Sequence, residues 1–261
     1  MRTDMMRGLL VAAVLTMAAH AASAADRLSG AWSTDAQTFI FKAQPGNRFW
    51  GVVCGPCDDP SAIFRIEDGK VIDDQHATFS IAYDVGGPLF KKYGAYREHV
   101  TATWSGDGWV LARQRAGGTE KTTGAIRRVV PGYEGLPAPK PAITTPAPDA
   151  KPSPIEGRWV AAGRNAQQNV TLKIRGNSVW GVICGPCRPE GVFLLDDGSF
   201  DGETVTFYIN HMDTPPSARK FGINRNHMRG KLVGNVMKFT WVREEADDQP
   251  GGEMTLIGPI R

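Results

Sequence analysis

The sequence predicts an all-β protein built from two small antiparallel barrels in tandem, of about eight strands each. Three observations lead to this prediction: one module occurs twice, apolar and polar residues alternate at period two, and turn residues separate the alternating runs. We expect a first β-module at residues 26–130, a Pro/Ala-rich linker at 131–154 and a second β-module at 155–261. A chain of 261 residues is long enough for two domains with separate cores.

The two modules share several short motifs in the same order. The tetrad CGPC follows Trp-Gly in both copies, at Cys54–Cys57 and at Cys184–Cys187. Two further matches lie upstream and downstream of it: Gly30-x-Trp32 with Gly157-x-Trp159, and Lys92-Tyr93-Gly94-x-x-Arg97-x-His99 with Lys220-Phe221-Gly222-x-x-Arg225-x-His227. A tandem duplication of one module explains this order.

Within each module, apolar residues recur at every second position. At 170–175, Val, Leu and Ile alternate with Thr, Lys and Arg, and at 237–241, Met, Phe and Trp alternate with Lys and Thr. This period places side chains on alternate faces of a strand. Turn signals separate the runs, for example Pro45-Gly46-Asn47, Glu67-Asp68-Gly69 and Gly106-Asp107-Gly108. Short strands joined by turns favour an antiparallel barrel or sandwich.

The Gly-x-Trp at the start of each module resembles the first-strand signature of calycin barrels, the lipocalin and avidin group. The resemblance covers three residues per copy and the number of strands. It implies a small barrel in which Trp32 or Trp159 packs across the closed end. It also implies a ligand pocket, without naming a ligand.

The segment from Pro131 to Pro154 separates the modules and is rich in Pro, Ala and Thr. Such a segment favours extended polyproline II over a packed core. We therefore expect a semi-rigid spacer between two independent modules.

Residues 1–25 have the pattern of a signal peptide. Arg2 and Arg7 flank its start, an apolar run follows at Gly8–Ala19, and Ala22-Ser23-Ala24 has the small residues of a cleavage site. Cleavage near residue 24 or 25 predicts a periplasmic or secreted protein. The apolar run is too short for a permanent membrane span. The formal net charge of +3 gives no support for a nucleic-acid partner or an anionic membrane.

CGPC is best known as a redox-active dithiol, which needs one cysteine at a helix N-terminus. Here strand-like residues precede the tetrads, at 49–53 and 179–183, and strand-like residues follow them, at 63–66 and 192–195. Both tetrads are therefore expected in loops between strands, and a thioredoxin fold is not expected.

Three interpretations of Cys54, Cys57, Cys184 and Cys187 stay open. Gly and Pro let the cysteines of one loop approach, and export favours a disulfide within each tetrad. CxxC is also a half-site for zinc, and the four cysteines can join in one all-cysteine metal site, while two thiolates satisfy copper(I). The third interpretation is a labile, redox-active disulfide. The first interpretation requires no cofactor.

The second repeated motif places an Arg and a His two residues apart. On a strand they share one face, opposite the apolar Val100 and Ala102 of the first copy. That face is expected to be solvated, to bind an anion, or to pack under a neighbouring loop such as CGPC. The two repeated tryptophans are candidates for core or pocket lining. The candidate ligand-binding residues are therefore Trp50, Arg97, His99, Trp180, Arg225 and His227.

No known catalytic motif occurs in a supporting context, so the sequence favours a non-enzymatic protein. The leading hypothesis is an exported binding protein of two barrel modules, each with a CGPC disulfide, whose partner is an unknown small molecule or protein. The alternative is a periplasmic thiol-based redox or zinc- or copper-handling protein that uses the two CGPC pairs.

Overall fold

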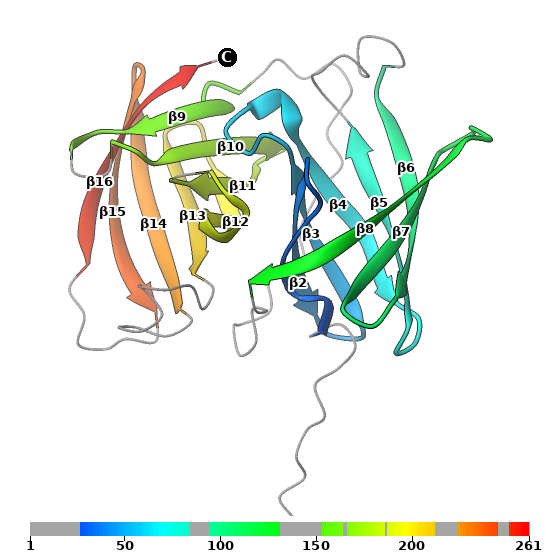
Figure 1. The fold of residues 1–261 in the computed structure, drawn as a ribbon. Helices are drawn as coiled ribbons and strands as arrows, with labels where there is room; N and C mark the ends of the chain where they lie inside the picture. The colour runs from blue at the N-terminus through cyan, green and yellow to red at the C-terminus, as the bar shows by residue number, and fades with distance from the viewer. Residues whose placement is uncertain are drawn as a thin grey trace, which may run out of the picture.

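The computed structural model describes residues 27–83, 94–130, 153–163, 166–185, 187–211, 224–244 and 251–260. These residues form two closed antiparallel barrels of eight strands each (Figure 1). The predicted fold class is thus confirmed. The expected signal peptide and residues 131–152 of the expected linker lie outside the described residues. In the described part of the chain, no helix has the length and apolarity needed to cross a membrane.

In each barrel every strand pairs with the next along the chain, and the last strand pairs with the first. Barrel 1 consists of β1 (Gly30–Ser33), β2 (Thr38–Gln44), β3 (Arg48–Cys54), β4 (Ile63–Val71), β5 (His76–Tyr83), β6 (Tyr96–Trp104), β7 (Gly108–Arg115) and β8 (Lys121–Val130). Barrel 2 consists of β9 (Gly157–Ala161), β10 (Asn169–Arg175), β11 (Ser178–Cys184), β12 (Val192–Phe200), β13 (Thr204–His211), β14 (Asn224–Val233), β15 (Val236–Glu244) and β16 (Gly252–Ile260).

The period-two alternation sends one set of side chains into each barrel. The interior of barrel 1 is rich in aromatic rings, with the Phe41 ring centroid 5.6 Å from that of Phe49 and 5.5 Å from that of Phe79. The interior of barrel 2 is more aliphatic, with Met228 and Met237 beside Phe207. Eight strands enclose a space that side chains can fill, and both barrels are packed in this way.

The Gly-x-Trp motif places a buried tryptophan in the core of each barrel. Trp32 donates its indole N–H to the carbonyl of Leu28 at 2.6 Å, and Trp159 donates to the carbonyl of Ile155 at 2.9 Å. The glycine before each tryptophan has a φ of 115° or 135°, which favours glycine. Both tryptophans are buried in their barrel cores, so this geometry agrees with the shape that the calycin resemblance implies.

The Asp-Gly pairs at 68–69 and 197–198 do not end strands, contrary to their interpretation as turn signals. Each lies inside one long strand, where the register with both neighbouring strands shifts. Asp68 has a φ of 55° and Asp197 a φ of 47°, as expected for β-bulges that kink a strand. A Cβ on Gly69 would lie 2.3 Å from the carbonyl oxygen of Phe49, so only glycine fits there.

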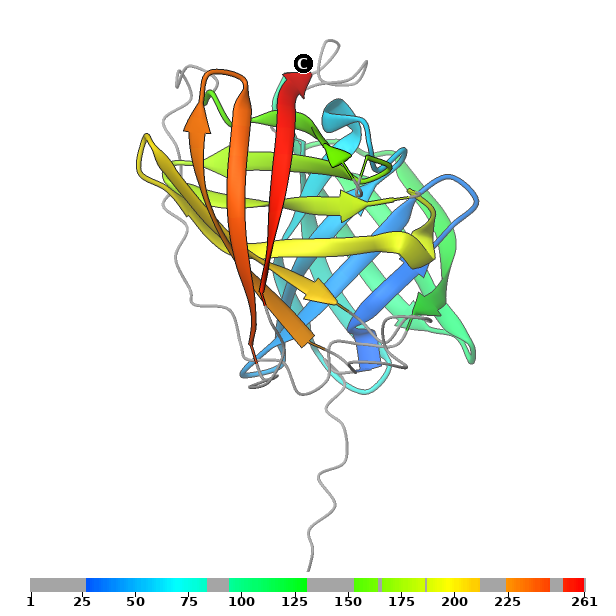
Figure 2. The same ribbon diagram turned by 90° about the vertical axis from the view of Figure 1, so that its left-hand side faces the viewer.

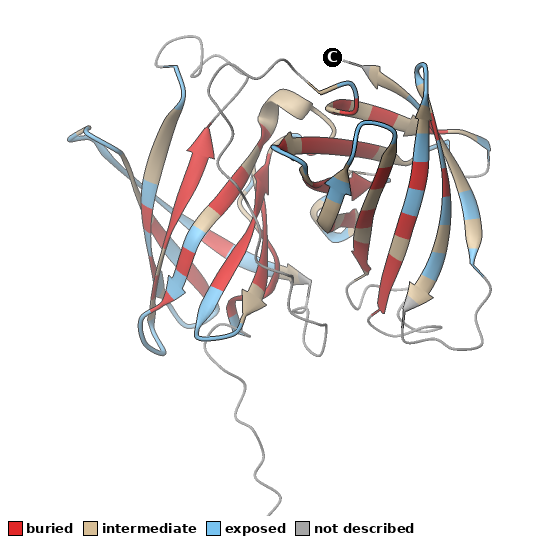
Figure 3. Cartoon of the chain, turned by 180° about the vertical axis from the view of Figure 1, so that it is seen from behind, coloured by how far each residue is buried: buried red, intermediate tan, exposed pale blue. Residues whose placement is uncertain are grey.

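The two barrels contact each other through their walls. Figures 1 and 2 show β10–β12 crossing β2–β4, and these strands share one apolar cluster. The buried members of the cluster are Ala31, Ile40, Trp50, Val52, Cys54, Cys57 and Ile63 of barrel 1 with Trp180, Val182, Cys184, Val192 and Leu194 of barrel 2. The strands β3 and β11 are buried on both faces over most of their length. Figure 3 shows buried residues, in red, where the two barrels meet. The expected independence of the modules is therefore wrong for the described residues.

Candidate functional site

Both CGPC tetrads are closed as disulfides. Cys54 bonds Cys57 and Cys184 bonds Cys187, with Cα–Cα distances of 4.8 and 4.7 Å. Each tetrad lies between two strands, as predicted, and the only helical turn that the described residues form before the next strand is a 3-10 helix of three residues, η1 (Pro60–Ala62) or η3 (Pro189–Gly191). The helix that a thioredoxin-like dithiol needs does not follow either tetrad.

The disulfides lie where the barrels meet. Cys54, Cys57 and Cys184 are at most 3% exposed, and Cys187 packs against the same apolar cluster. The Cys184 sulfur lies 3.9 Å from the carbonyl oxygen of Cys57 in the opposite barrel. Thiol exchange requires attack on a disulfide sulfur, so this burial protects both bonds.

The contacts of the two CGPC loops are reciprocal. The loop of barrel 1 reaches β10 through η1 and places Asp58 3.5 Å from Arg158 at the start of β9. The loop of barrel 2 reaches β1 and β8 through η3. Each loop thus braces the opposite barrel, in the manner of a twofold-related interface.

Trp50 and Trp180 lie at the centre of this interface and not in a barrel interior. The guanidinium carbon of Arg65 lies 5.0 Å from the Trp50 ring centroid and 5.6 Å from that of Trp180, so one cation contacts both rings. The indole nitrogens of both tryptophans are buried without a hydrogen-bond partner in the described residues. Trp50 and Trp180 were expected to line a core or a pocket. The structure places both in a core that the two barrels share.

The repeated arginines neutralise acids at the interface. Arg225 donates to Asp196 at 3.2 Å and to Asp197 at 2.7 Å, and Lys42 of the opposite barrel also donates to Asp196. Burial lowers the pKa of Lys42, although Asp196 opposes this effect. The Arg225 side chain is only 4% exposed and its guanidinium carbon lies 4.0 Å from the Tyr208 ring centroid, so it does not lie on a solvated face.

Barrel 1 contains the matching cluster. Glu67 accepts hydrogen bonds from Arg97 of its own barrel and from Arg175 of barrel 2. Burial would raise the pKa of Glu67, but the arginines around it outweigh burial and lower it. Arg97 is 40% exposed, so this cluster is wetter than that of Asp196.

The two repeated histidines lie away from the cysteines. His99 is exposed on the outer wall, with its Nδ1 3.3 Å from the Ser80 hydroxyl. His227 stacks on Tyr208 with ring centroids 4.6 Å apart. Neither histidine belongs to a group of three His, Cys, Asp or Glu side chains that could hold a metal in the described residues.

A second cluster, which the sequence interpretation missed, lies inside barrel 1. Each barrel has one end from which its CGPC loop extends, and we call this end the mouth of the barrel. Arg113 donates there to Glu98 at 2.8 Å, to Gln37 at 2.9 Å and to the hydroxyl of Tyr83. Burial raises the pKa of Tyr83, so its hydroxyl stays protonated and donates to Glu98 at 3.2 Å. This network is complete, and its aromatic side continues from Tyr83 to the stacked ring of Tyr96.

The mouth of barrel 2 has different side chains at the same positions. Asn226 donates to His211 Nε2 at 2.9 Å, and the His211 ring lies 5.0 Å from that of Phe193. Burial and the positive charge of Arg243 lower the pKa of His211 to about 4, so it is neutral near pH 7. The sequence feature that could have revealed both clusters is the alternation of side chains along the strands. Glu98 lies two residues before the inward Val100, and Asn226 two residues before the inward Met228, so both also point inward.

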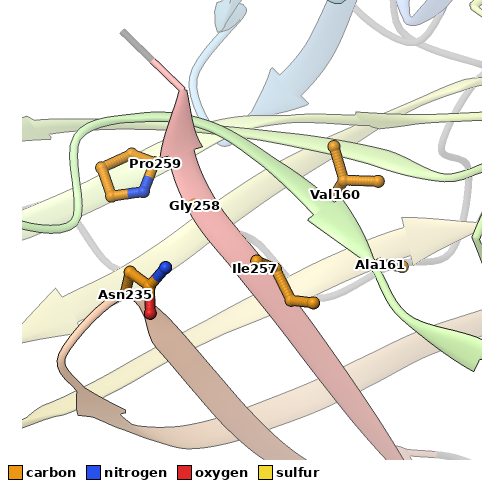
Figure 4. Close-up of a pocket in the computed structure, with 6 residues that line it drawn as sticks. All are labelled: Val160, Ala161, Asn235, Ile257, Gly258 and Pro259. Atoms are coloured by element: carbon orange, nitrogen blue, oxygen red, sulfur yellow. The ribbon is translucent and has the colours of Figure 1, made fainter.

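A shallow depression of about 430 Å³ lies on the seam between β9 and β16 (Figure 4). Its lining residues are Val160, Ala161, Asn235, Ile257, Gly258 and Pro259. They include one side-chain amide and no titratable group, so the depression offers no acid–base or nucleophilic chemistry.

No three His, Cys, Asp or Glu side chains in the described residues form a metal-binding group. A zinc or copper site at the cysteines would require both disulfides to be reduced first. Comparisons with protein-family models, with curated proteins and with solved structures found no match for this chain.

Proposed function

We propose that the protein is an exported, non-enzymatic binding protein whose two barrels act as one body and take ligands at their mouths. The observation that carries the proposal is the mouth clusters, where polar side chains converge among aromatic rings inside a packed barrel. Sites of this composition are typical of small-molecule binding. The predicted signal peptide and the two disulfides are compatible with export.

The repeated motifs support a structural role instead of a catalytic one. The cysteines and the repeated arginines contact the opposite barrel or the acids that face it. The interface is formed by the same face of both modules, so it requires two copies of the module. We therefore assign CGPC a structural role, in which each disulfide loop stabilises the contact between the two barrels.

A count of thiols and metals tests the structural role of CGPC. We expect the native chain, purified without reductant, to contain no free thiol, no stoichiometric zinc or copper, and disulfide potentials below about −300 mV. Four free thiols with bound metal, or catalytic turnover of a disulfide substrate, would support the thiol-based alternative and overturn the proposal.

Nuclear magnetic resonance of the mature chain tests ligand binding. A mixture of small neutral and charged fragments should shift amide signals at 83, 98 and 113, at 211, 226 and 241, or at both sets. If the fragments shift only the amide signals of interface or outer-wall residues, binding at the mouths is contradicted.

A further inference from the structure

The two faces that form the interface differ at one central position. Val52 and Val182 each follow the repeated Trp-Gly directly, so they are equivalent. Arg65 of β4 pairs with Val52. Leu194 of β12 pairs with Val182, so it has the place in barrel 2 that Arg65 has in barrel 1. Arg65 is 8% exposed and Leu194 is fully buried, so a charged and an aliphatic side chain occupy equivalent buried positions.

Arg65 lies between the two repeated tryptophans. Its guanidinium carbon is 5.0 Å from the Trp50 ring centroid and 5.6 Å from that of Trp180. In an interface with twofold symmetry, the operation that exchanges the two rings also brings the equivalent of Arg65 between them. In this chain that equivalent is Leu194, a member of the shared apolar cluster. The two rings therefore receive one cation and one aliphatic side chain.

Two copies of barrel 1 could not meet through this face in the same way. Their twofold pair would place two Arg65 guanidiniums between two Trp50 rings, where like charges in a poorly solvated contact repel each other. Two copies of barrel 2 would instead place two Leu194 side chains between two Trp180 rings, and all of these groups are apolar. Arg65 thus restricts barrel 1 to a partner that has no cation at this position.

The buried acid of barrel 2 would also find a partner in a second barrel 2. Asp196 accepts a hydrogen bond from Lys42 of barrel 1 across the interface. Lys173 is the counterpart of Lys42, because it pairs with Trp180 as Lys42 pairs with Trp50. Two copies of barrel 2 would therefore each bring an acid and a lysine to the same relative positions. In charge as well as in its apolar centre, the face of barrel 2 is complementary to itself.

We infer that the interface face of barrel 2 also fits the same face of a second copy of this chain, and that Arg65 prevents the corresponding pairing of barrel 1. In the intact chain the linked barrel 1 competes at an effective concentration of about millimolar, so the pair within one chain forms first. A second copy binds barrel 2 once barrel 1 has left that face. The inference concerns the interface and does not depend on ligands at the mouths.

Two variants of the mature chain test this selectivity by opening the pair from either side. Val52→Lys and Val182→Lys each place a charge at an equivalent, fully buried position of the contact, so the barrels should separate in both. Val52→Lys leaves the face of barrel 2 intact and should have the mass of a dimer at micromolar concentration, by size exclusion with light scattering. Val182→Lys leaves only the face of barrel 1 and should be a monomer.

A second substitution in each variant should reverse its result. Leu194→Arg added to Val52→Lys should dissociate the dimer, because it brings two guanidiniums between the Trp180 rings. Arg65→Leu added to Val182→Lys should produce a dimer, because the face of barrel 1 then has the apolar centre of barrel 2. A dimer of Val52→Lys that persists with Leu194→Arg would use another surface and would overturn the inference.

The stability of the closed chain gives a second test, which does not require the opened variants to fold. Leu194→Arg alone brings two guanidiniums between the rings and should lower the urea midpoint of unfolding. Arg65→Leu in the same chain leaves one cation and one leucine again, so it should recover most of that loss. If the two changes in midpoint simply add in the double variant, the two residues do not share one place and the inference is wrong.

Equal behaviour of the two opened variants would also contradict the inference. If Val52→Lys and Val182→Lys both dimerise, Arg65 does not restrict barrel 1. If both are monomers that retain the circular dichroism of the folded barrels, the face of barrel 2 is not complementary to itself.

Discussion

The interface and the mouths differ in how closely the two barrels match each other. At the interface, equivalent positions hold the same residue types, such as Trp50 with Trp180 and Arg97 with Arg225. At the mouths, Glu98 is matched by Asn226 and Arg113 by Trp241. The shared motifs are thus the ones that a reciprocal interface requires, whereas the mouths have separate chemistries.

The largest expected effect concerns the buried acid of the interface. Asp196→Ala removes the carboxylate that faces Lys42 and Arg225, whose side chains are 2% and 4% exposed. Leaving two buried cations without this partner should cost about 3–5 kcal/mol in the free energy of unfolding, measured with urea.

The matched control is Glu67→Ala in barrel 1. Its partner Arg97 is 40% exposed and can be solvated, but its partner Arg175 is only 10% exposed, so the loss should be smaller than that of Asp196→Ala, about 2–3 kcal/mol. Equal losses in the two variants would show that the clusters do not differ in burial as described.

The second effect is a pH dependence from one mouth. The pKa of His211 is lowered from 6.5 to about 4 in the folded chain, so the unfolded chain binds more protons between these values. Stability should therefore fall by about 3 kcal/mol as the pH decreases from about 6.5 to about 4. His211→Gln should remove this slope in urea unfolding at each pH.

Tyr83→Phe is the matched change in barrel 1. Because the pKa of Tyr83 is raised, its hydroxyl does not titrate between pH 4 and 6.5, and the slope should persist in this variant. A slope that survives in His211→Gln would assign the pH dependence to another group.

The third effect concerns the two disulfides. Replacing Cys54 and Cys57 by serine opens a very small loop, so the loss should be about 2 kcal/mol. The same change at Cys184 and Cys187 should cost about as much, since the loops are equivalent. Dithiothreitol should reduce the wild-type bonds only at urea concentrations that separate the barrels, as followed by thiol labelling. Fast reduction in the absence of urea would contradict their protection.

The smallest effect separates the two repeated histidines. His227→Ala removes a ring stacked on Tyr208 and should cost about 0.5–1 kcal/mol. His99→Ala acts at an exposed position and should stay within about 0.5 kcal/mol by urea unfolding. A larger loss for His99 would reveal a contact outside the described residues.

The sequence was sufficient for the barrels because their signals are local. The period-two runs, the turns and the duplicated module predicted two barrels, and a disulfide within each short loop was one of the three interpretations of the cysteines. The Asp-Gly bulges were misinterpreted as turns, because the residues that allow a left-handed conformation in a turn also allow it in a bulge.

The interface was only half predictable. At 49–54 the strand is apolar on both faces, which indicates a second surface against its outer wall. No local sequence pattern shows which surface covers this strand, because that depends on how the two folded barrels dock. The mouth clusters were hidden for a related reason: an inward polar residue such as Asn226 has the same residue type as an outward one, and only its strand parity distinguishes it.

The reciprocal interface also bears on how the two mouths could become different. In a symmetric homodimer of single modules, every substitution occurs twice, so both ligand sites must change together. Joining the two copies in one chain removes that constraint while the shared wall keeps its geometry. One half can then carry Arg113 at an inward position where the other half carries Trp241, so the two halves of one polypeptide can differ as the subunits of a heterodimer do.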